Sequence, residues 1–166
     1  YPIYQTATYA HPGVGQSTGF DYSRLQNPTK EHLEKIVASL EHGCDALALS
    51  TGMAAITLLM ELFKPGDHLI VDSDLYGGSI RLFRNVSRKN GITFSAVDSY
   101  QDDVESFVKE ETKAIYIETP TNPMMNVTDI GKLSEIAKRH NLLLIVDNTF
   151  LSPYFQNPLT LGADIV

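Results

Sequence analysis

Residues 142–150 read LLLIVDNTF, in which five bulky apolar residues run without a break into Asp147. Such a run without alternation is typical of a strand that is covered on both faces, as in a parallel sheet. Asp147 therefore stands at the edge of an apolar core, where an unpaired carboxylate is costly. Two interpretations fit it: a turn residue that ends the strand, since Asp is common in turns, or a group that holds a ligand.

The same pattern recurs along the chain and predicts an α/β fold. Apolar runs alternate with segments of helical periodicity, which implies right-handed crossovers and a mainly parallel sheet flanked by helices. The expected strands are DALALS (45–50), HLIVD (68–72), ITFSAVD (92–98), KAIYIE (113–118), LLLIVD (142–147) and ADIV (163–166). The expected helices between them are 52–63, 78–91, 102–111 and 129–141, the last capped by Asp129.

The N-terminal part of the chain differs from this alternation. Residues 1–28 have no periodic pattern and are predicted to form an arm, while 29–166 form one α/β unit. A helix is expected in PTKEHLEKIVASLEHG (28–43), with Gly43 as its left-handed end. Its apolar stripe consists of Leu33, Ile36, Val37 and Leu40.

Composition narrows the class of protein. The net charge is -7 and no basic stretch exists to meet phosphates, which argues against a nucleic-acid binder. No apolar run approaches the roughly 20 residues that cross a bilayer. The single cysteine, Cys44, excludes an internal disulfide and gives no metal cluster. We therefore expect a cytoplasmic protein without a metal, whose partner is a small molecule.

In an open parallel sheet, ligands collect outside the carboxyl ends of the strands, which we call the carboxyl edge. Four of the expected strands are followed by polar residues or glycine: Ser50–Met53, Ser73–Gly78, Thr119–Pro123 and Asn148–Thr149. The first of these segments leads into a helix and suits a phosphate, although it also reads as an ordinary helix cap. Tyr76 could cover a flat ligand or be a core tyrosine, and Asn122 could bind outward or be a turn residue.

Known nucleotide motifs are absent from this edge. The sequence has no GxxxxGK[ST], and GVG at 13–15 lies in the arm rather than after a strand. A non-catalytic nucleotide-binding module stays as an alternative from another class. Together, the segments outline an aromatic ring with a phosphate at one end and a basic nitrogen near Asp147. A carboxylate beside a pyridine nitrogen favours the protonated ring, which is what pyridoxal phosphate chemistry demands.

Five stretches carry a resemblance to a known family. They are YSRLQNPT (22–29), STGMAAI (50–56), DLYGGSIRLF (74–83), ETPTNP (118–123) and VDNTFLSPYFQNPLTLGAD (146–164). They resemble the cystathionine γ-synthase, cystathionine γ-lyase and methionine γ-lyase family of pyridoxal-phosphate enzymes. The resemblance implies that 29–166 are part of the large, cofactor-binding domain of the aspartate-aminotransferase-type fold (fold type I).

The implied activity is elimination or replacement at the γ-carbon of sulfur amino acids or O-acylhomoserine, by a trans-sulfuration lyase or transferase. Cystathionine β-lyase and methionine γ-lyase are alternatives. After LYG the methionine γ-lyases carry cysteine where this chain has Gly78. That difference favours the members that handle cystathionine or O-acylhomoserine.

The resemblance also assigns roles to residues. Backbone N–H groups of Gly52 and Met53 would bind the phosphate, Tyr76 would stack on the ring and handle protons, and Asp147 would pair with the ring nitrogen. Tyr76 and Asp147 are the expected catalytic residues. The other expected cofactor-binding residues are Ser50, Thr149, Asn122 at the ring's 3-oxygen, Glu118 in support, and Tyr22 and Arg24. The last two would reach a neighbouring subunit's phosphate, which implies a homo-oligomer of at least a dimer, and by resemblance a tetramer.

The family holds its cofactor through a Schiff-base lysine that follows the strand beginning here at ADIV. None of the eight lysines of this chain follows an expected strand at the carboxyl edge. The sequence stops at Val166, inside an apolar run, which is a poor place for a natural terminus. We therefore expect a segment of a longer chain that ends before the catalytic lysine and has no turnover by itself.

Overall fold

The computed structural model describes residues 1–166, which fall into two compact units. The N-terminal unit is Tyr1–Ala48 and the C-terminal unit is Leu49–Val166. The helix after the arm therefore groups with the arm rather than with the α/β unit. No helix is both long enough and apolar enough to cross a membrane.

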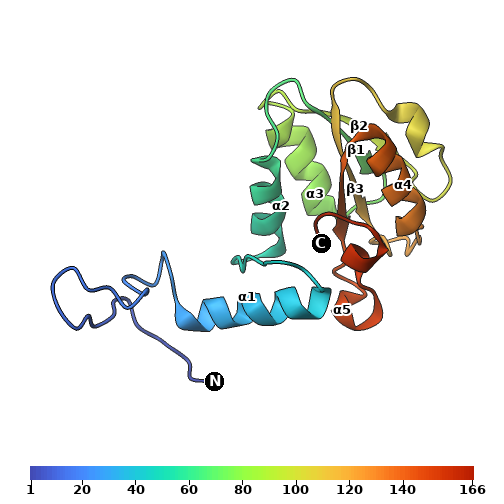
Figure 1. Ribbon diagram of the computed structural model, residues 1–166. Helices are drawn as coiled ribbons and strands as arrows, with labels where there is room; N and C mark the ends of the chain where they lie inside the picture. Colours follow the sequence, from blue (N-terminus) through green and yellow to red (C-terminus); the bar gives the residue numbers. More distant parts are fainter. The chain divides into compact units, whose positions relative to one another are not determined.

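Four parallel strands form the sheet of the C-terminal unit (Figure 1). They are β1 His68–Asp72, β2 Thr93–Val97, β3 Thr112–Glu118 and β4 Leu143–Asp147, in the order β2-β1-β3-β4. The expected parallel α/β sheet is thereby confirmed. Because all four strands run the same way, their carboxyl ends share one edge, and Glu118 pairs with Asp147 in register.

Two of the expected strands do not form. DALALS (45–50) has no strand pairing, and its Leu47 and Leu49 are exposed. At ADIV only an isolated parallel bridge joins Ile165 to Ile145. A strand exists through its ladder of hydrogen bonds, so an apolar run that has no full-length neighbour stays irregular.

The helices of the C-terminal unit follow the expected segments in part. They are α2 Gly52–Met60, α3 Gly77–Leu82, the π-helix η1 Phe83–Ser87, the 3-10 helix η2 Val104–Phe107, α4 Ile130–His140, α5 Ser152–Phe155 and the 3-10 helix η3 Pro158–Leu161. The helix expected at 102–111 was wrong, because only η2 forms there. Asp102 accepts the backbone N–H of Asp98, and such side-chain bonds compete with helix formation.

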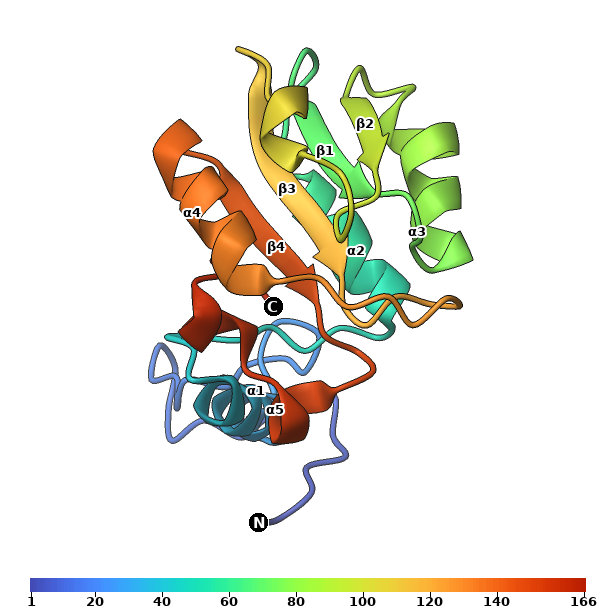
Figure 2. The same ribbon diagram turned by 90° about the vertical axis from the view of Figure 1, so that its right-hand side faces the viewer.

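Helices cover both faces of the sheet (Figure 2). On one face, α4 packs through Leu133, Ile136 and Ala137 against alternate strand residues such as Ile115 and Leu144. Asp129 caps α4 as predicted, with its carboxylate accepting the N–H of Lys132 at 3.0 Å.

The opposite face is covered by α2 and the α3–η1 segment. Ile56, Met60 and Phe83 pack there against the other set of strand residues, including Val71 and Tyr116. Successive strand side chains point to opposite faces, so the continuous apolar runs are explained by two covered faces.

The N-terminal unit consists of the arm and α1 Pro28–Glu41. Asn27 caps α1, and its side chain accepts the N–H of Thr29 at 2.8 Å. The left-handed residue at the end of α1 is His42 with φ 58°, not the predicted Gly43. The N–H of Gly43 still donates to the carbonyl of Ala38. The apolar stripe of α1 forms as expected, but its four residues are 40–54% exposed within this structure.

Candidate functional site

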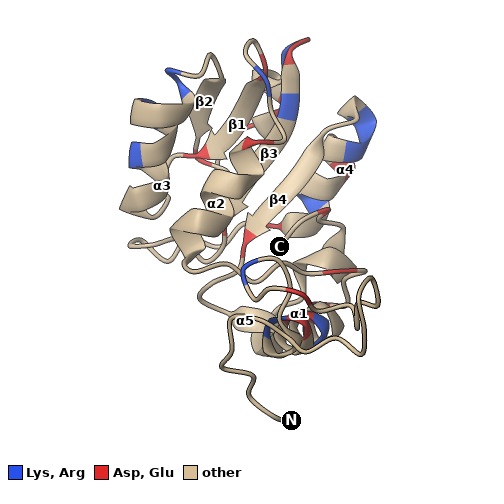
Figure 3. Cartoon of the chain, turned by 90° about the vertical axis from the view of Figure 1, so that its left-hand side faces the viewer, with Lys and Arg blue, Asp and Glu red and all other residues tan.

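A cavity of about 500 Å³ lies at the carboxyl edge of the sheet. It is lined by Thr51, Gly52, Met53, Ile56, Tyr76, Glu118, Asn122, Asp147, Thr149 and Phe150. Figure 3 shows acidic residues at the ends of the strands on this side of the sheet. Seven of the residues predicted from the sequence thus meet in one cavity: Gly52, Met53, Tyr76, Glu118, Asn122, Asp147 and Thr149.

The start of α2 forms one wall of this cavity. Thr51 caps the helix, and its hydroxyl accepts the N–H of Ala54 at 3.0 Å. The N–H groups of Gly52 and Met53 donate to no acceptor within the protein. A Cβ on Gly52 would meet no atom within 4 Å, so the space above this turn is open. Free N–H groups and the positive end of the helix dipole suit an anion such as phosphate.

Tyr76 also lines this cavity, and its backbone holds it in place. Its N–H donates to Oε2 of Glu118 at 2.7 Å, and its side chain is half exposed. The ring occupies the space beside Gly78, where an added Cβ would lie 2.5 Å from Cε1 of the ring. The same Cβ would lie 2.7 Å from the sulfur of Met53. Gly78 therefore makes room for the tyrosine ring beside the start of α2.

Asp147 ends β4, and its carboxylate is held from two sides. Oδ1 accepts the N–H and the hydroxyl of Thr149 at 3.1 and 2.5 Å, and Oδ2 accepts the hydroxyl of Tyr116 at 3.4 Å. Burial, together with the charge of Asp147, raises the pKa of Tyr116 well above its usual value. Tyr116 therefore stays protonated and can donate to Asp147. Together, Tyr116 and Thr149 hold the Asp147 carboxylate in place at the cavity.

Glu118 lies beside Asp147 and is almost fully buried. Burial raises the pKa of Glu118 to about 7, against the opposing effect of the Tyr76 N–H, and the charges of Asp147, Asp74 and Asp72 raise it further. Near neutral pH this carboxyl is therefore poised between its two protonation states. A cationic ligand group in the cavity would favour the ionised form.

Asn122 lies in a loop that other residues tie down. The hydroxyl of Thr121 donates to Asp74 at 2.5 Å and accepts the N–H of Asn126 at 2.9 Å. The amide of Asn122 itself makes no hydrogen bond within the protein and faces the cavity. The peptide bonds that precede Pro120 and Pro123 are both cis.

Three of the ten predicted residues lie elsewhere. Ser50 does not line the cavity. Tyr22 and Arg24 belong to the N-terminal unit, where the Arg24 guanidinium lies 5.0 Å from the centre of the Tyr22 ring.

Sequence reasoning missed the wall residues Thr51, Ile56 and Phe150, and also Tyr116 behind Asp147. Tyr116 stands two residues before Glu118 in the same strand, so the period of two could have placed both on one face.

Comparison with known proteins agrees with this geometry. The family described as "Cys/Met metabolism PLP-dependent enzyme" matches residues 1–166. The chain belongs to this family.

Individual relatives of this pyridoxal-phosphate family differ in activity. A cystathionine gamma-synthase/O-acetylhomoserine (thiol)-lyase of Bacillus subtilis is 55% identical over 99% of this chain and 44% of its own length. A cystathionine beta-lyase of Lactococcus lactis is 51% identical over the same shares. The crystal structure of cystathionine gamma-lyase from Lactobacillus plantarum, complexed with L-serine, superposes with a TM-score of 0.93 at 47% identity. It is matched over 99% of this chain and 43% of that chain, so this chain spans less than half of the relatives' length.

The residues of the cavity fit pyridoxal phosphate. An anion site with free N–H groups at α2 suits its phosphate, and the carboxylate of Asp147 suits a basic ring nitrogen. Asn122, whose amide is unpaired, and Tyr76 line the same cavity. The fold agrees as well, since the parallel sheet and its helices are those of the fold type I relatives.

Proposed function

We propose that the protein containing this chain catalyses pyridoxal-phosphate-dependent elimination or replacement at the γ-carbon of sulfur amino acids or O-acylhomoserine. The single observation that carries this proposal is the meeting of an anion site, an aromatic side chain and a held carboxylate in one cavity. The relatives named cystathionine gamma-synthase and gamma-lyase support it, since they match almost the whole chain.

We assign the cofactor's phosphate to the N–H groups of Gly52 and Met53, and its ring nitrogen to Asp147. The protonated pyridine ring, when bound, would withdraw electrons from the substrate carbons attached to it. Asp147 keeps that proton in place because its negative charge favours the cationic ring. Thr149 and Tyr116 orient the carboxylate through the hydrogen bonds described above.

Tyr76, Asn122 and Glu118 complete the proposed site. Tyr76 covers the ring and excludes water from it, and its hydroxyl can hold or move a proton at the substrate. Asn122 offers its unpaired amide to the ring's 3-oxygen. Glu118 positions Tyr76 through the backbone bond at 2.7 Å. Ser50 is retained as a supporting residue near the start of α2.

None of the eight lysines lines the cavity. We propose that the lysine that binds the cofactor covalently is contributed from outside these 166 residues. Borohydride reduction of the natural protein, followed by digestion and mass spectrometry, should find the pyridoxyl group on a lysine outside residues 1–166. Modification of Lys64 or any other of the eight lysines would contradict this assignment.

A second candidate is cystathionine β-lyase activity, because a relative of that name is 51% identical over 99% of this chain. Methionine γ-lyase activity is less favoured, because Gly78 stands where we expect cysteine in those enzymes. We propose testing purified natural protein side by side with cystathionine, with methionine, and with O-acetylhomoserine plus cysteine as the thiol that replaces acetate, measuring pyruvate, 2-oxobutyrate and thioether product. Turnover of O-acetylhomoserine or release of 2-oxobutyrate supports the γ-carbon reaction, and pyruvate alone from cystathionine supports the β-lyase.

Both candidate activities would be wrong if the natural protein were colourless and bound nucleotide instead of pyridoxal phosphate. We place the protein in the cytoplasm, as its single cysteine and amino-acid substrates suggest.

For its assembly we propose a homo-oligomer in which Tyr22 and Arg24 bind the phosphate of a neighbouring subunit's cofactor, with a tetramer as the expected form. An Arg24→Ala variant mixed with Asp147→Ala should regain part of the activity through hybrid sites, and no recovery would count against shared sites.

A further inference from the structure

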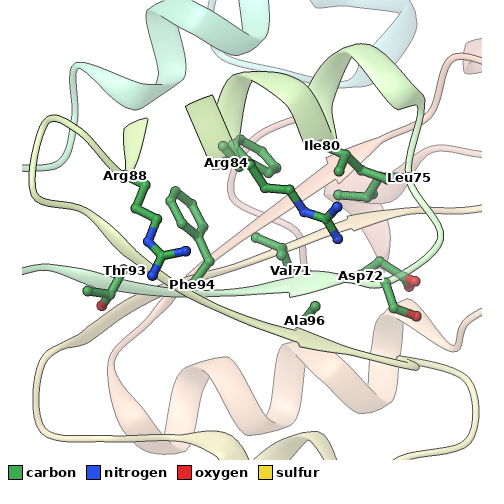
Figure 4. Close-up of a pocket in the computed structure, with 11 residues that line it drawn as sticks. Val71, Asp72, Leu75, Ile80, Arg84, Arg88, Thr93, Phe94 and Ala96 are labelled. Carbon is green, nitrogen blue, oxygen red and sulfur yellow. The ribbon is translucent and has the colours of Figure 1, made fainter. Parts of the chain in front are cut away.

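A second cavity, of about 340 Å³, lies between the α3–η1 segment and strands β1 and β2 (Figure 4). Its lining shares no residue with the cavity at the carboxyl edge. The floor and walls are mainly apolar, and they consist of Val71, Leu75, Ile80, Phe83, Phe94 and Ala96. The Phe83 and Phe94 rings stack with their centres 5.0 Å apart, so one wall of the cavity is aromatic.

Two arginines lie over this apolar floor. Arg84 and Arg88 are both exposed and extend over the strands: Arg88 lies beside Phe94 and Thr93, and Arg84 points toward Asp72 and Leu75 (Figure 4). They are four residues apart on the π-turn, in which the N–H of Arg88 donates to the carbonyl of Phe83 at 3.0 Å. Residues at this spacing lie on one side of a helix, and like charges there repel each other.

Neither arginine has a counter-ion in the structure. All five ion pairs of the chain involve other residues. Neither Arg84 nor Arg88 makes a side-chain hydrogen bond. Both lack a partner although the chain carries seven more negative than positive charges. Asp72 lines the cavity but is already engaged: Oδ1 accepts the N–H of Asp74 at 3.0 Å and Oδ2 accepts the Ser99 hydroxyl. Burial also raises the pKa of Asp72, which weakens its charge as a partner for an arginine.

We propose that this cavity binds a small organic anion with an apolar body, whose charged group pairs with Arg84 and Arg88. The apolar body would lie against Phe94, which is partly exposed and stacks on the buried Phe83, and would replace water over this apolar surface. A carboxylate or phosphate would accept charge-assisted hydrogen bonds from these guanidinium groups, which have no other acceptor in the protein. The volume falls at the small end of ligand pockets, which favours a single ring or a short chain.

The test is isothermal titration calorimetry on the natural, cofactor-loaded protein with 3-phenylpropionate as probe. Phenyl phosphate tests the other anionic group, and 3-phenylpropanamide is the neutral match in shape. We expect 3-phenylpropionate, phenyl phosphate or both to bind saturably at one site per chain, and the amide to bind at least about tenfold more weakly.

Variants assign the binding to this cavity. Arg84→Gln and Arg88→Gln should each weaken the binding of the anion about tenfold, whereas Lys89→Gln, which removes a charge just outside the lining, should change it less than about twofold. Ala96→Leu keeps both arginines but fills the cavity, so it should abolish binding while the visible absorption of the cofactor reports an intact fold.

Two outcomes would overturn the proposal. One is that neither anion binds saturably to protein that retains its cofactor absorption. The other is binding that Arg84→Gln, Arg88→Gln and Ala96→Leu leave unchanged, which would place the probe elsewhere. The design does not depend on the proposed reaction, because turnover is not measured.

Discussion

The two ends of the same parallel sheet treat polar side chains in opposite ways. At the amino end, His68 is fully buried, and its two ring nitrogens pair with the hydroxyls of Thr112 and Ser95 at 2.8 and 2.9 Å. At the carboxyl end, the N–H groups of Gly52 and Met53 and the amide of Asn122 have no partner and face a cavity. Gly52 is exposed and Met53 and Asn122 are partly exposed, so a ligand can reach these groups and accept or donate the hydrogen bonds that the protein leaves open.

This contrast separates stability from function. The hydrogen bonds of His68 join β1 to both of its neighbours, because Ser95 lies in β2 and Thr112 in β3. Substitution there should damage the fold and leave the chemistry of the remaining folded protein intact. Substitution at the carboxyl edge should do the reverse.

The largest expected effect is that of Asp147→Ala in the natural protein. In the proposed site, loss of the carboxylate would remove the charge that holds the proton on the cofactor ring, so kcat/KM should fall about a thousandfold, or roughly 4 kcal/mol of transition-state stabilisation. Steady-state assays with the preferred substrate measure it, and the melting temperature should change by only a few degrees. Asp164→Ala is a carboxylate control that lies outside the cavity. Near-normal turnover of Asp147→Asn would restore the view that this residue only ends a strand.

The second effect concerns the amino end. His68→Leu leaves the Thr112 and Ser95 hydroxyls without their ring partner and should destabilise the protein by about 3 kcal/mol. The measurement is the melting temperature, together with activity per folded molecule, which should stay within about twofold. The exposed His140, which pairs with Glu105 at the surface, is the matched control, and His140→Leu should cost less than about 1 kcal/mol. A loss of activity per folded molecule in His68→Leu would erase the contrast between the two ends.

The third effect is a pH dependence that Glu118 confers on the cofactor-free protein. The pKa of Glu118 in the folded protein, about 7, lies above its usual value of 4.5. The stability that Glu118 contributes is therefore fully present below pH 4.5 and is lost as pH rises to 7. Burial lowers the pKa of His68, so His68 has the opposite effect on stability. The stability that it contributes is lost as pH falls below 6.5. The free energy of unfolding, obtained from melting curves between about pH 4.5 and 7.5, should therefore change with pH by about 2 kcal/mol less in Glu118→Gln than in the unmodified protein. An unchanged slope in Glu118→Gln would mean that this carboxyl does not titrate in that range.

The sequence predicts the carboxyl edge better than it predicts what surrounds it. Asp147 and Glu118 end the apolar runs that form β4 and β3, so their place at the edge is a consequence of strand direction and could be predicted. Gly52 lines the cavity as the first residue of α2 and not from a strand end, because DALALS forms no strand. Phe150 lies beyond the end of β4, where no strand or helix pattern predicts its position, whereas the period of two along β3 could have placed Tyr116. The strand expected at DALALS failed for a related reason, since pairing depends on a neighbour and not on the apolar run itself. The cavity beneath Arg84 and Arg88 depends on the π-turn, which no pattern in the sequence indicates.

The smallest effect tests how Gly78 supports the carboxyl edge, through two neighbouring glycines that differ only in their surroundings. A Cβ on Gly77 would meet only Arg81 at 3.7 Å, an ordinary contact, whereas a Cβ on Gly78 would overlap the Tyr76 ring and the Met53 sulfur. Gly78→Ala must therefore displace the ring or the start of α2, and we expect about a tenfold loss in kcat/KM, or roughly 1.4 kcal/mol. Gly77→Ala should stay within about twofold, since alanine suits a helix.

Part of the loss in Gly78→Ala should appear as weaker retention of pyridoxal phosphate, measured by dialysis and the visible absorption of the protein. The reason is that we assign a backbone N–H of Met53 to the phosphate, so a shift of its side chain would disturb the phosphate and the ring together. If the two glycine substitutions had equal effects, the Tyr76 ring would not depend on the space that Gly78 leaves by having no side chain. The contrast between the two ends of the sheet would then rest on Asp147 and Glu118 alone.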